Sequence, residues 1–238
     1  MPAVILVHGG PHVRYHWGWH GGVQLLANRG YLVLQVNYRG STGYGKDFLN
    51  AGRKEWGGKM QDDVTDAARW VVAQGWADPG RVAIIGASYG GYAALAGATF
   101  TPDVFACAVS AMGPSNLITF LETVPPYWKP YLVRLKLRIG DPATEAEFLR
   151  SRSPLFHVER IKIPILLMYG ANDARVKISE GEQIVAAMAA KGIDYEFIVF
   201  PDEGHGFQQP HNRIKYYAAA EGFLAKHLGG RYEPYEEQ

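Results

Sequence analysis

Short apolar runs alternate with longer amphipathic stretches along the whole chain. Each apolar run is bounded by glycine, proline or aspartate, which is typical of a strand buried on both faces. These runs predict strands at residues 3–8, 31–37, 81–86, 104–110, 164–169 and 195–200. The stretches between them predict helices at residues 21–29, 60–74, 89–99, 178–191 and 211–228. Because strands and helices in strict alternation form mostly parallel sheets covered on both faces, we expect a doubly wound α/β fold with about six strands.

One stretch, residues 113–140, departs from this alternation. Prolines interrupt it, and its large aromatic side chains are Phe120, Tyr127, Trp128 and Tyr131. In doubly wound sheets, ligands bind beyond the carboxyl ends of the strands. We therefore interpret this stretch as a small aromatic insertion over that edge, with a surface loop that packs a few aromatics as the alternative.

The composition excludes several classes of protein. The 238 residues are 47% hydrophobic and 20% charged, which suits a folded chain with one sizeable core. We expect a single domain over residues 1–238. A formal net charge of +1 favours neither nucleic acid nor an anionic membrane as a partner. Because no apolar run is long enough to span a bilayer and no basic signal region precedes the first strand, the expected location is cytoplasmic.

The strongest chemical signal is a serine between glycines at the end of a predicted strand. Ser88 stands in Gly86-Ala87-Ser88-Tyr89-Gly90, directly before a helix-compatible stretch. This G-x-S-x-G pattern is typical of the nucleophile elbow, the sharp strand-to-helix turn that exposes a serine hydroxyl above the sheet of an α/β-hydrolase. We interpret Ser88 as a nucleophile, with a chance glycine-rich turn as the alternative.

A serine hydroxyl needs a neighbouring base to attack at neutral pH, and this fold delivers the partners in the order serine, acid, histidine. Asp173 follows the fifth predicted strand and His205 follows the sixth, so both lie at the same sheet edge as Ser88. We predict that His205 is the general base and that Asp173 orients it. The competing acids, Asp202 and Glu203, lie too close in sequence to His205 to reach its Nδ1 easily.

Acyl transfer also requires hydrogen-bond donors for the oxyanion. One donor in a nucleophile elbow is the backbone N–H of the residue after the serine, here Tyr89. The second comes from the loop after the first strand, which reads His8-Gly9-Gly10-Pro11. Because glycine lets the backbone turn its N–H toward the site, Gly9 or Gly10 is the expected donor.

The remaining patterns predict no metal and no cofactor. His8, His12, His16 and His20 recur at every fourth position, but the glycines and proline among them disfavour a continuous helix. The glycine-rich segment 39–45 lacks the form of a phosphate-binding loop. Acyl transfer through a serine requires neither kind of group.

Five segments together match the pattern of a known family. They are His8-Gly9-Gly10-Pro11, residues 37–45, residues 86–92, residues 172–176 and Gly204-His205-Gly206. This set resembles the catalytic domain of the prolyl oligopeptidase family, and most closely that of acylaminoacyl peptidases and dipeptidyl peptidases. The resemblance covers nearly the whole chain, and the set is far more specific than any one motif.

The resemblance implies further roles. Tyr44 matches a tyrosine whose hydroxyl donates to the oxyanion in several members, so Tyr44, Gly9 and Gly10 all stay open as the second donor. Arg175 matches an arginine that binds a substrate carbonyl. Val176 matches a wall of the pocket for the residue before the scissile bond. From loop position alone, a solvated arginine and a packed valine fit equally well.

The sequence departs from the family pattern at its start. Family peptidases carry an N-terminal β-propeller that filters substrates, and their hydrolase domain usually begins with two further strands; this sequence contains neither. We expect either a part of a longer protein or a free-standing minimal hydrolase. The strand at 31–37 would then lie near an uncovered sheet edge, and because such edges pair with other chains, we predict a homo-oligomer or poor solubility.

Three functions fit these residues. The resemblance implies a serine peptidase that cleaves short or N-acylated peptides through an acyl-enzyme. A stand-alone carboxylesterase acting on short acyl esters is the alternative, and a non-catalytic binding domain that kept the fold is the third. In both enzymes Ser88 attacks an acyl carbon and water later releases the acyl group. The sequence leaves the acyl and leaving-group preferences open.

Overall fold

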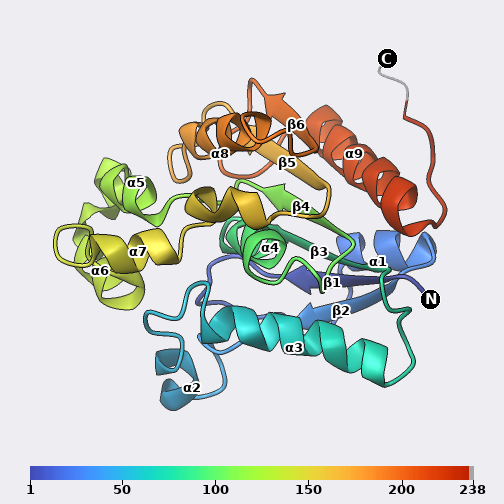
Figure 1. Cartoon of the computed structure of the whole chain (residues 1–238), viewed down its shortest axis with the longest axis horizontal. Coiled ribbons are helices and arrows are strands. Elements are labelled where there is room, and N and C mark those ends of the chain that lie inside the picture. The colour runs from blue at the N-terminus through green and yellow to red at the C-terminus, as the bar shows by residue number, and fades with distance from the viewer. Residues whose placement is uncertain (236–238) are drawn as a thin grey trace.

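The computed structural model describes residues 1–235, which contain a six-stranded sheet at the centre of the molecule (Figure 1). Its strands are β1 (Ala3–Val7), β2 (Leu32–Val36), β3 (Val82–Ala87), β4 (Cys107–Ala111), β5 (Ile165–Gly170) and β6 (Tyr195–Phe200). They lie in the order β2-β1-β3-β4-β5-β6, and all neighbours are parallel. The predicted α/β fold is therefore confirmed. The chain reverses its direction across the sheet between β1 and β3, where doubly wound sheets open a crevice for ligands.

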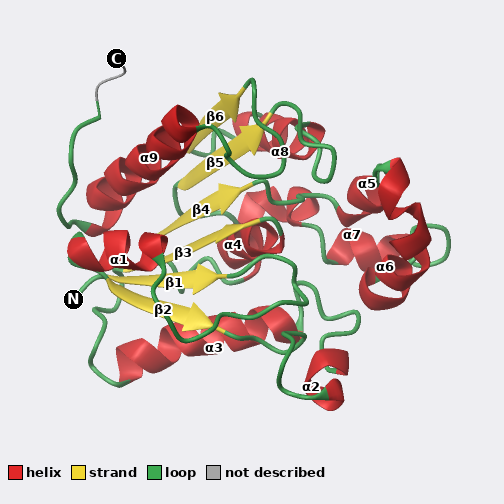
Figure 2. Ribbon diagram, turned by 180° about the vertical axis from the view of Figure 1, so that it is seen from behind, coloured by secondary structure: helices red, strands yellow, loops and turns green. Residues whose placement is uncertain are grey.

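Helices cover both faces of the sheet (Figures 1 and 2). The five helices predicted from the sequence are α1 (Gly21–Asn28), α3 (Lys59–Ala73), α4 (Tyr89–Phe100), α8 (Ser179–Ala189) and α9 (Pro210–Leu228). α1 and α9 pack on one face, and α3, α4 and α8 pack on the other. Among residues 1–235, no helix has the length and apolar character needed to cross a bilayer.

Alternating side chains of each strand supply the two halves of the core. In β5, Ile165 and Leu167 face the layer of α3, α4 and α8, whereas Leu166 and Met168 face the layer of α1 and α9. All of β5 is buried, so both faces of the strand must be apolar, and this is why it reads as a continuous hydrophobic run. Burial on both sides holds the strand ends, and the loops that leave them, in fixed positions.

Residues 113–140 are more regular than a proline-broken loop. They contain α5 (Leu117–Glu122), the 3-10 helix η1 (Pro126–Tyr131) and α6 (Leu132–Ile139). Three short elements outside this stretch were also not predicted: α2 (Lys46–Asn50), α7 (Ala146–Ser151) and the 3-10 helix η2 (Pro154–Arg160). Five of these elements have only five to seven residues, which show too little periodicity for a sequence pattern to reveal them, whereas α6 is amphipathic and was missed because the prolines before it indicated an irregular stretch. As expected, α5 and α6 lie beyond the carboxyl ends of the strands (Figure 2).

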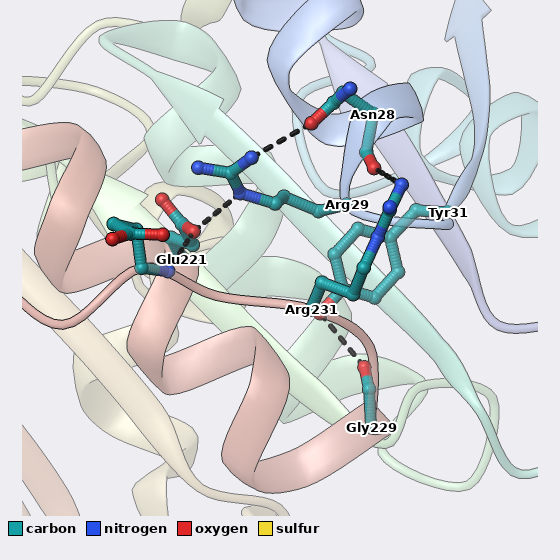
Figure 3. Close-up of polar contacts among 7 residues, drawn as sticks. Asn28, Arg29, Tyr31, Glu221, Gly229 and Arg231 are labelled. Carbon is teal, nitrogen blue, oxygen red and sulfur yellow. Dashed lines mark hydrogen bonds and ion pairs between the residues drawn. The ribbon is translucent and has the colours of Figure 1, made fainter.

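The segment after α9 is fastened to the end of α1 (Figure 3). The guanidinium of Arg29 donates to Glu221 of α9 at 2.5 Å, and the backbone N–H of Arg231 donates to the carbonyl of Arg29 at 3.0 Å. The hydroxyl of Tyr31 donates to the carbonyl of Gly229 at 2.8 Å. These contacts join the start of β2 to the last described residues, at the end of the sheet away from the insertion.

The strand at 31–37 does lie at an edge of the sheet, because β2 pairs only with β1 within residues 1–235. Side chains of β2 are partly exposed along its whole length. Association with a second copy through this edge stays a prediction, and size-exclusion chromatography that finds a monodisperse monomer would contradict it.

Candidate active site

Ser88 occupies a backbone conformation that few non-glycine residues adopt. Its φ is 59° and its ψ is −122°, directly between the last residue of β3 and the first residue of α4. Its N–H donates to the carbonyl of Ala111 at the end of β4 at 2.8 Å. The glycine two positions later lets α4 pass close to β1, because a Cβ on Gly90 would overlap the carbonyl oxygen of Val7. The G-x-S-x-G segment therefore forms a strained turn that lifts the serine above the sheet.

Three side chains from three strand ends meet at this turn. The Oγ of Ser88 lies 3.0 Å from Nε2 of His205, and Nδ1 of His205 lies 2.7 Å from Oδ2 of Asp173. Ser88 follows β3, Asp173 follows β5 and His205 follows β6. The carboxylate is fully buried and the imidazole is 16% exposed, so the pair is shielded while the histidine still reaches the solvent side. The structure brings together all three residues that the sequence placed at this edge.

Backbone hydrogen bonds hold the carboxylate of Asp173 in place. Its Oδ1 accepts from the N–H of Arg175 at 2.8 Å and from the N–H of Val176 at 3.0 Å, which leaves Oδ2 for His205. The competing acid Glu203 is engaged elsewhere. Its carboxylate accepts N–H groups of the segment that follows it, from Gln208 at 2.9 Å and from Gln209 at 2.8 Å. Glu203 thus shapes the loop that carries His205 and does not contact its ring.

The loop after β1 approaches Ser88 from the other side. Gly9 packs against the elbow, since a Cβ there would lie 3.0 Å from the carbonyl oxygen of Ala87 and 3.3 Å from the Cβ of Ser88. Gly10, with φ of 112°, lines the same pocket as Ser88 and Tyr89. Gly10 and Tyr89 thus both line the pocket that contains Ser88, and Gly9 packs against the turn that carries the serine.

Tyr44 lies outside that pocket. Its side chain is 51% exposed, its ring packs on Phe48, and its hydroxyl accepts a hydrogen bond from the amide of Asn37 at 2.8 Å. The resemblance suggested Tyr44 as an oxyanion donor; Gly10 lines the pocket beside Ser88 whereas Tyr44 does not, and the identity of the second donor stays a prediction. A motif match alone did not reveal which way this loop presents the tyrosine.

A pocket beside Ser88 has mostly apolar walls. Its lining includes Trp56, Tyr89, Phe120, Trp128 and Val176, and two of these aromatics come from the insertion. Val176 lines this pocket, and its role as a wall for the residue before the scissile bond stays a prediction. Arg175 is exposed, and its guanidinium carbon lies 5.7 Å from the ring centre of Trp128. That distance is typical of a cation–π contact, and the role of Arg175 in binding a substrate carbonyl stays a prediction.

The four periodic histidines have separate surroundings. His8 is buried, and its Nε2 lies 2.9 Å from the hydroxyl of Ser41. Burial lowers the pKa of His8, although its bond to a backbone carbonyl opposes the shift. His20 caps α1, and His16 has no metal-ligating neighbour within the described part of the chain. His12 lines the Ser88 pocket, and its Nδ1 donates to the carbonyl of Gly40 at 2.9 Å.

Sequence patterns did not identify two residues that shape the site. Trp56 lies in a turn without any recognisable motif, yet it is 5% exposed and its ring centre lies 4.6 Å from that of Tyr89. Glu180 of α8 is 1% exposed and accepts the N–H groups of Ser115 at 2.9 Å and Asn116 at 2.8 Å. Burial raises the pKa of Glu180, against the hydrogen bonds that lower it. This carboxyl anchors the start of the insertion.

Comparison with known proteins agrees with this geometry. A family profile described as the prolyl oligopeptidase family matches residues 17–231. The chain belongs to the prolyl oligopeptidase family. Among curated relatives, dipeptidyl aminopeptidase BIII of Pseudoxanthomonas mexicana is 57% identical over 98% of this chain and 34% of its own length. Dipeptidyl peptidase family member 6 of Caenorhabditis elegans is 46% identical over 98% of this chain and 32% of its own length.

Solved structures show the same relationship. A puromycin-hydrolyzing peptidase of Mycobacterium tuberculosis superposes with a TM-score of 0.93 and 35% identity, covering 99% of this chain and 35% of that protein. Acylamino-acid-releasing enzymes are also among the relatives, so both branches named in the resemblance are represented. The chain thus spans about a third of the length of the relatives it matches.

Proposed function

We propose that this chain carries the catalytic site of a serine peptidase that cleaves short peptides through an acyl-enzyme on Ser88. One observation carries the proposal: the imidazole of His205 lies between the Ser88 hydroxyl at 3.0 Å and the Asp173 carboxylate at 2.7 Å. A histidine held between a serine and a buried carboxylate is the arrangement that activates a serine for acyl transfer. Membership of the prolyl oligopeptidase family supports a peptide as the substrate.

The proposed reaction assigns one task to each group. Ser88 Oγ attacks the peptide carbonyl carbon while Nε2 of His205 takes the hydroxyl proton. The same nitrogen then gives that proton to the leaving amine as the peptide bond breaks, which leaves an acyl-enzyme. Water, deprotonated by His205, attacks the ester carbon; the bond to Ser88 Oγ then breaks, the imidazolium returns the proton to that oxygen, and the acid leaves. Asp173 fixes the tautomer of His205 and stabilises the imidazolium that forms twice in this cycle.

The oxyanion of each tetrahedral intermediate would accept hydrogen bonds from the backbone N–H groups of Tyr89 and Gly10. Tyr89 is the first residue of α4, so its N–H has no partner within that helix, and the positive end of the helix dipole favours negative charge there. Removal of one such donor from a serine hydrolase costs about 2.7–4 kcal/mol of transition-state stabilisation.

The test compares amide and ester substrates on the protein expressed from its complete reading frame. Dipeptidyl p-nitroanilides, N-acyl-aminoacyl p-nitroanilides and a short-chain p-nitrophenyl ester distinguish the peptidase from the carboxylesterase. We expect turnover of an anilide and a decrease in kcat of about 10⁶-fold in Ser88→Ala. A fluorophosphonate probe should label the wild-type protein and not Ser88→Ala, while Ser151→Ala, which removes an exposed hydroxyl from α7, should be labelled normally.

Each outcome bears on a different function. Turnover of the ester alone would favour the carboxylesterase. Absence of turnover and of labelling would refute the proposal in favour of a non-catalytic binding domain. Retention of the full rate by Ser88→Ala would show that the assigned nucleophile is wrong.

A further inference from the structure

Arg138, in the last turn of α6, is a buried cation without a counter-charge. The residue is only 8% exposed, and its Nη1 is closed to solvent without a hydrogen-bond partner. Within residues 1–235, its guanidinium takes part in no ion pair or side-chain hydrogen bond. An isolated charge held away from water is costly, so proteins rarely keep one without a ligand or a partner.

The charges around Arg138 increase the electrostatic cost of burying it. Burial lowers its pKa, and repulsion from Arg134 on the same helix and from Arg53 after α2 lowers it further. His12, which lines the same pocket, also has a lowered pKa, to which burial contributes most and Arg138 and Arg134 add. The potential in this part of the cleft is therefore positive.

The neighbouring carboxylates are already engaged with other cations. Asp141, just after α6, pairs with Lys136 at 3.0 Å. Glu145 pairs with the Nζ of Lys54 at 2.6 Å. Neither carboxylate contributes to the pKa shift of Arg138, which reflects burial and other arginines. A compensating anion must therefore come from outside the described chain.

The cation lies where a substrate would pass. Arg138 lines the pocket beside Ser88 and also the wider pocket next to it, and these two pockets share Gly10, His12, Trp128 and Leu135. Arg134 lines the wider pocket only. α6 lies beyond the carboxyl ends of the strands (Figure 1), and Ser88 follows the carboxyl end of β3. The half-buried side chains of Trp128 and Leu135 give this part of the cleft apolar walls, and a charge pair is screened less beside such walls than in bulk water.

We propose that Arg138, assisted by Arg134 at the rim, binds a carboxylate of the peptide substrate in the Ser88 cleft. A guanidinium matches a carboxylate in geometry and can bind it through two parallel N–H···O bonds. Two parts of a peptide could supply this group: an acidic side chain before the scissile bond, or the free carboxyl terminus of a short leaving segment. The inference rests on the proposed peptidase function and adds a substrate class to it.

The experiment measures kcat/KM for paired substrates with the protein expressed from its complete reading frame. The first pair is glycyl-glutamyl and glycyl-glutaminyl p-nitroanilide, which differ in one charge at almost constant shape. The second pair is one tripeptide as the free acid and as the C-terminal amide. Variants are Arg138→Gln, Arg138→Lys and Arg134→Gln. The control, Arg69→Gln, removes a charge of the same sign from α3, beside the start of β3.

The wild-type protein should prefer the carboxylate member of one pair by 10- to 100-fold, the range of a hydrogen bond to a charged group. Arg138→Gln should abolish that preference, Arg138→Lys should retain part of it, and Arg134→Gln should reduce it less. Arg69→Gln should leave it unchanged. The pair that responds identifies the source of the carboxylate.

The inference is overturned if Arg138→Gln changes neither ratio by more than twofold while a fluorophosphonate still labels Ser88. That result would arise if a carboxylate from elsewhere in a longer chain neutralised Arg138. Affinity provides a second measure that does not depend on the folding of Arg138 variants. In Ser88→Ala, the Kd of the free-acid or glutamyl peptide should be lower than the Kd of its uncharged partner. Equal Kd values within both pairs would also overturn the inference. Failure of the wild-type protein to cleave any substrate would instead refute the peptidase function.

Discussion

Replacement of Asp173 by asparagine gives the sharpest test of the proposed catalytic geometry. The backbone N–H groups of Arg175 and Val176 both donate to Oδ1 of Asp173, at 2.8 and 3.0 Å. In Asp173→Asn the amide oxygen must keep this position, because only an oxygen can accept those bonds. The amide nitrogen then faces Nδ1 of His205 and donates to it. The imidazole is therefore forced into the tautomer that carries its proton on Nε2, the nitrogen that lies 3.0 Å from Ser88 Oγ.

A base that already holds its proton cannot accept another from Ser88. We expect kcat of Asp173→Asn to fall by about 10⁴-fold, as for the same change in other serine hydrolases. At about 1.36 kcal/mol for each tenfold change, this is about 5.4 kcal/mol of activation free energy. Thermal unfolding should change little, because both backbone hydrogen bonds remain. Asp173→Ala should instead lower stability by about 1–3 kcal/mol for each buried N–H that loses its acceptor.

The assay is initial-rate kinetics on the preferred anilide, with melting temperature measured on the same samples. Asp202→Asn is the matched control, since Asp202 lies near His205 in sequence but pairs with Asn212 at 2.8 Å. Its rate should stay within a few-fold of wild type. If Asp173→Asn kept more than a tenth of the wild-type kcat, or if Asp202→Asn lost as much activity, the tautomer argument would be refuted.

Four other substitutions test the scaffold. Gly90→Ala should destabilise the protein by about 3 kcal/mol or more in urea unfolding, because its methyl group would overlap a carbonyl of β1. The control, Gly222→Ala in α9, meets nothing within 4 Å and should stabilise the protein by about 0.5–1 kcal/mol. If the two variants showed the reverse order of stability, the close approach of α4 to β1 would be contradicted. Glu180→Ala should lower the free energy of unfolding by about 2–6 kcal/mol, because it leaves two buried N–H groups unpaired, and it should also raise KM. An unchanged KM would show that the insertion does not need this anchor. Tyr31→Phe should cost about 1 kcal/mol through the lost bond to Gly229, and a neutral result in urea unfolding would mean that the terminal segment adds no stability.

The sequence predicted the central sheet well because its inner strands β3, β4 and β5 are buried on both sides and read as continuous apolar runs. Where the bounds of an apolar run differ from those of the observed strand, the cause is a loop whose side chains pack into the core. The run at 104–110 begins three residues before β4 (Cys107–Ala111), since Val104 and Phe105 pack into the core from a turn. Apolar character alone does not distinguish a buried turn from a buried strand. In the insertion, α5 and η1 were missed because six residues are too few to display a period, and α6 was missed because the prolines before it indicated an irregular stretch.

The catalytic geometry could be predicted because each of its three groups lies in the segment that follows a strand, and strand ends converge in a parallel sheet. Substrate-binding groups carry no such positional signal. Tyr44 matched a motif but lies outside the Ser88 pocket, whereas Arg138 matched nothing and lies within it. In the sequence Arg138 is one of several basic residues in an amphipathic helix, and such residues are normally solvated. Only the packing of α6 over the strand ends turns it into a buried charge.

The segment from Asp173 to Glu180 links the chemistry to the pocket. It begins with the carboxylate that orients His205, continues with the pocket wall Val176, and ends with the carboxyl that holds the insertion at Ser115. A shift of this segment would therefore move the base and the pocket together. The α8 helix that follows is packed against β5 and β6, the two strands that position Asp173 and His205. Because one unit carries all of these contacts, substitutions that loosen the insertion should change KM and kcat jointly. A change at the Arg138 guanidinium should instead alter only the preference between charged and uncharged substrates.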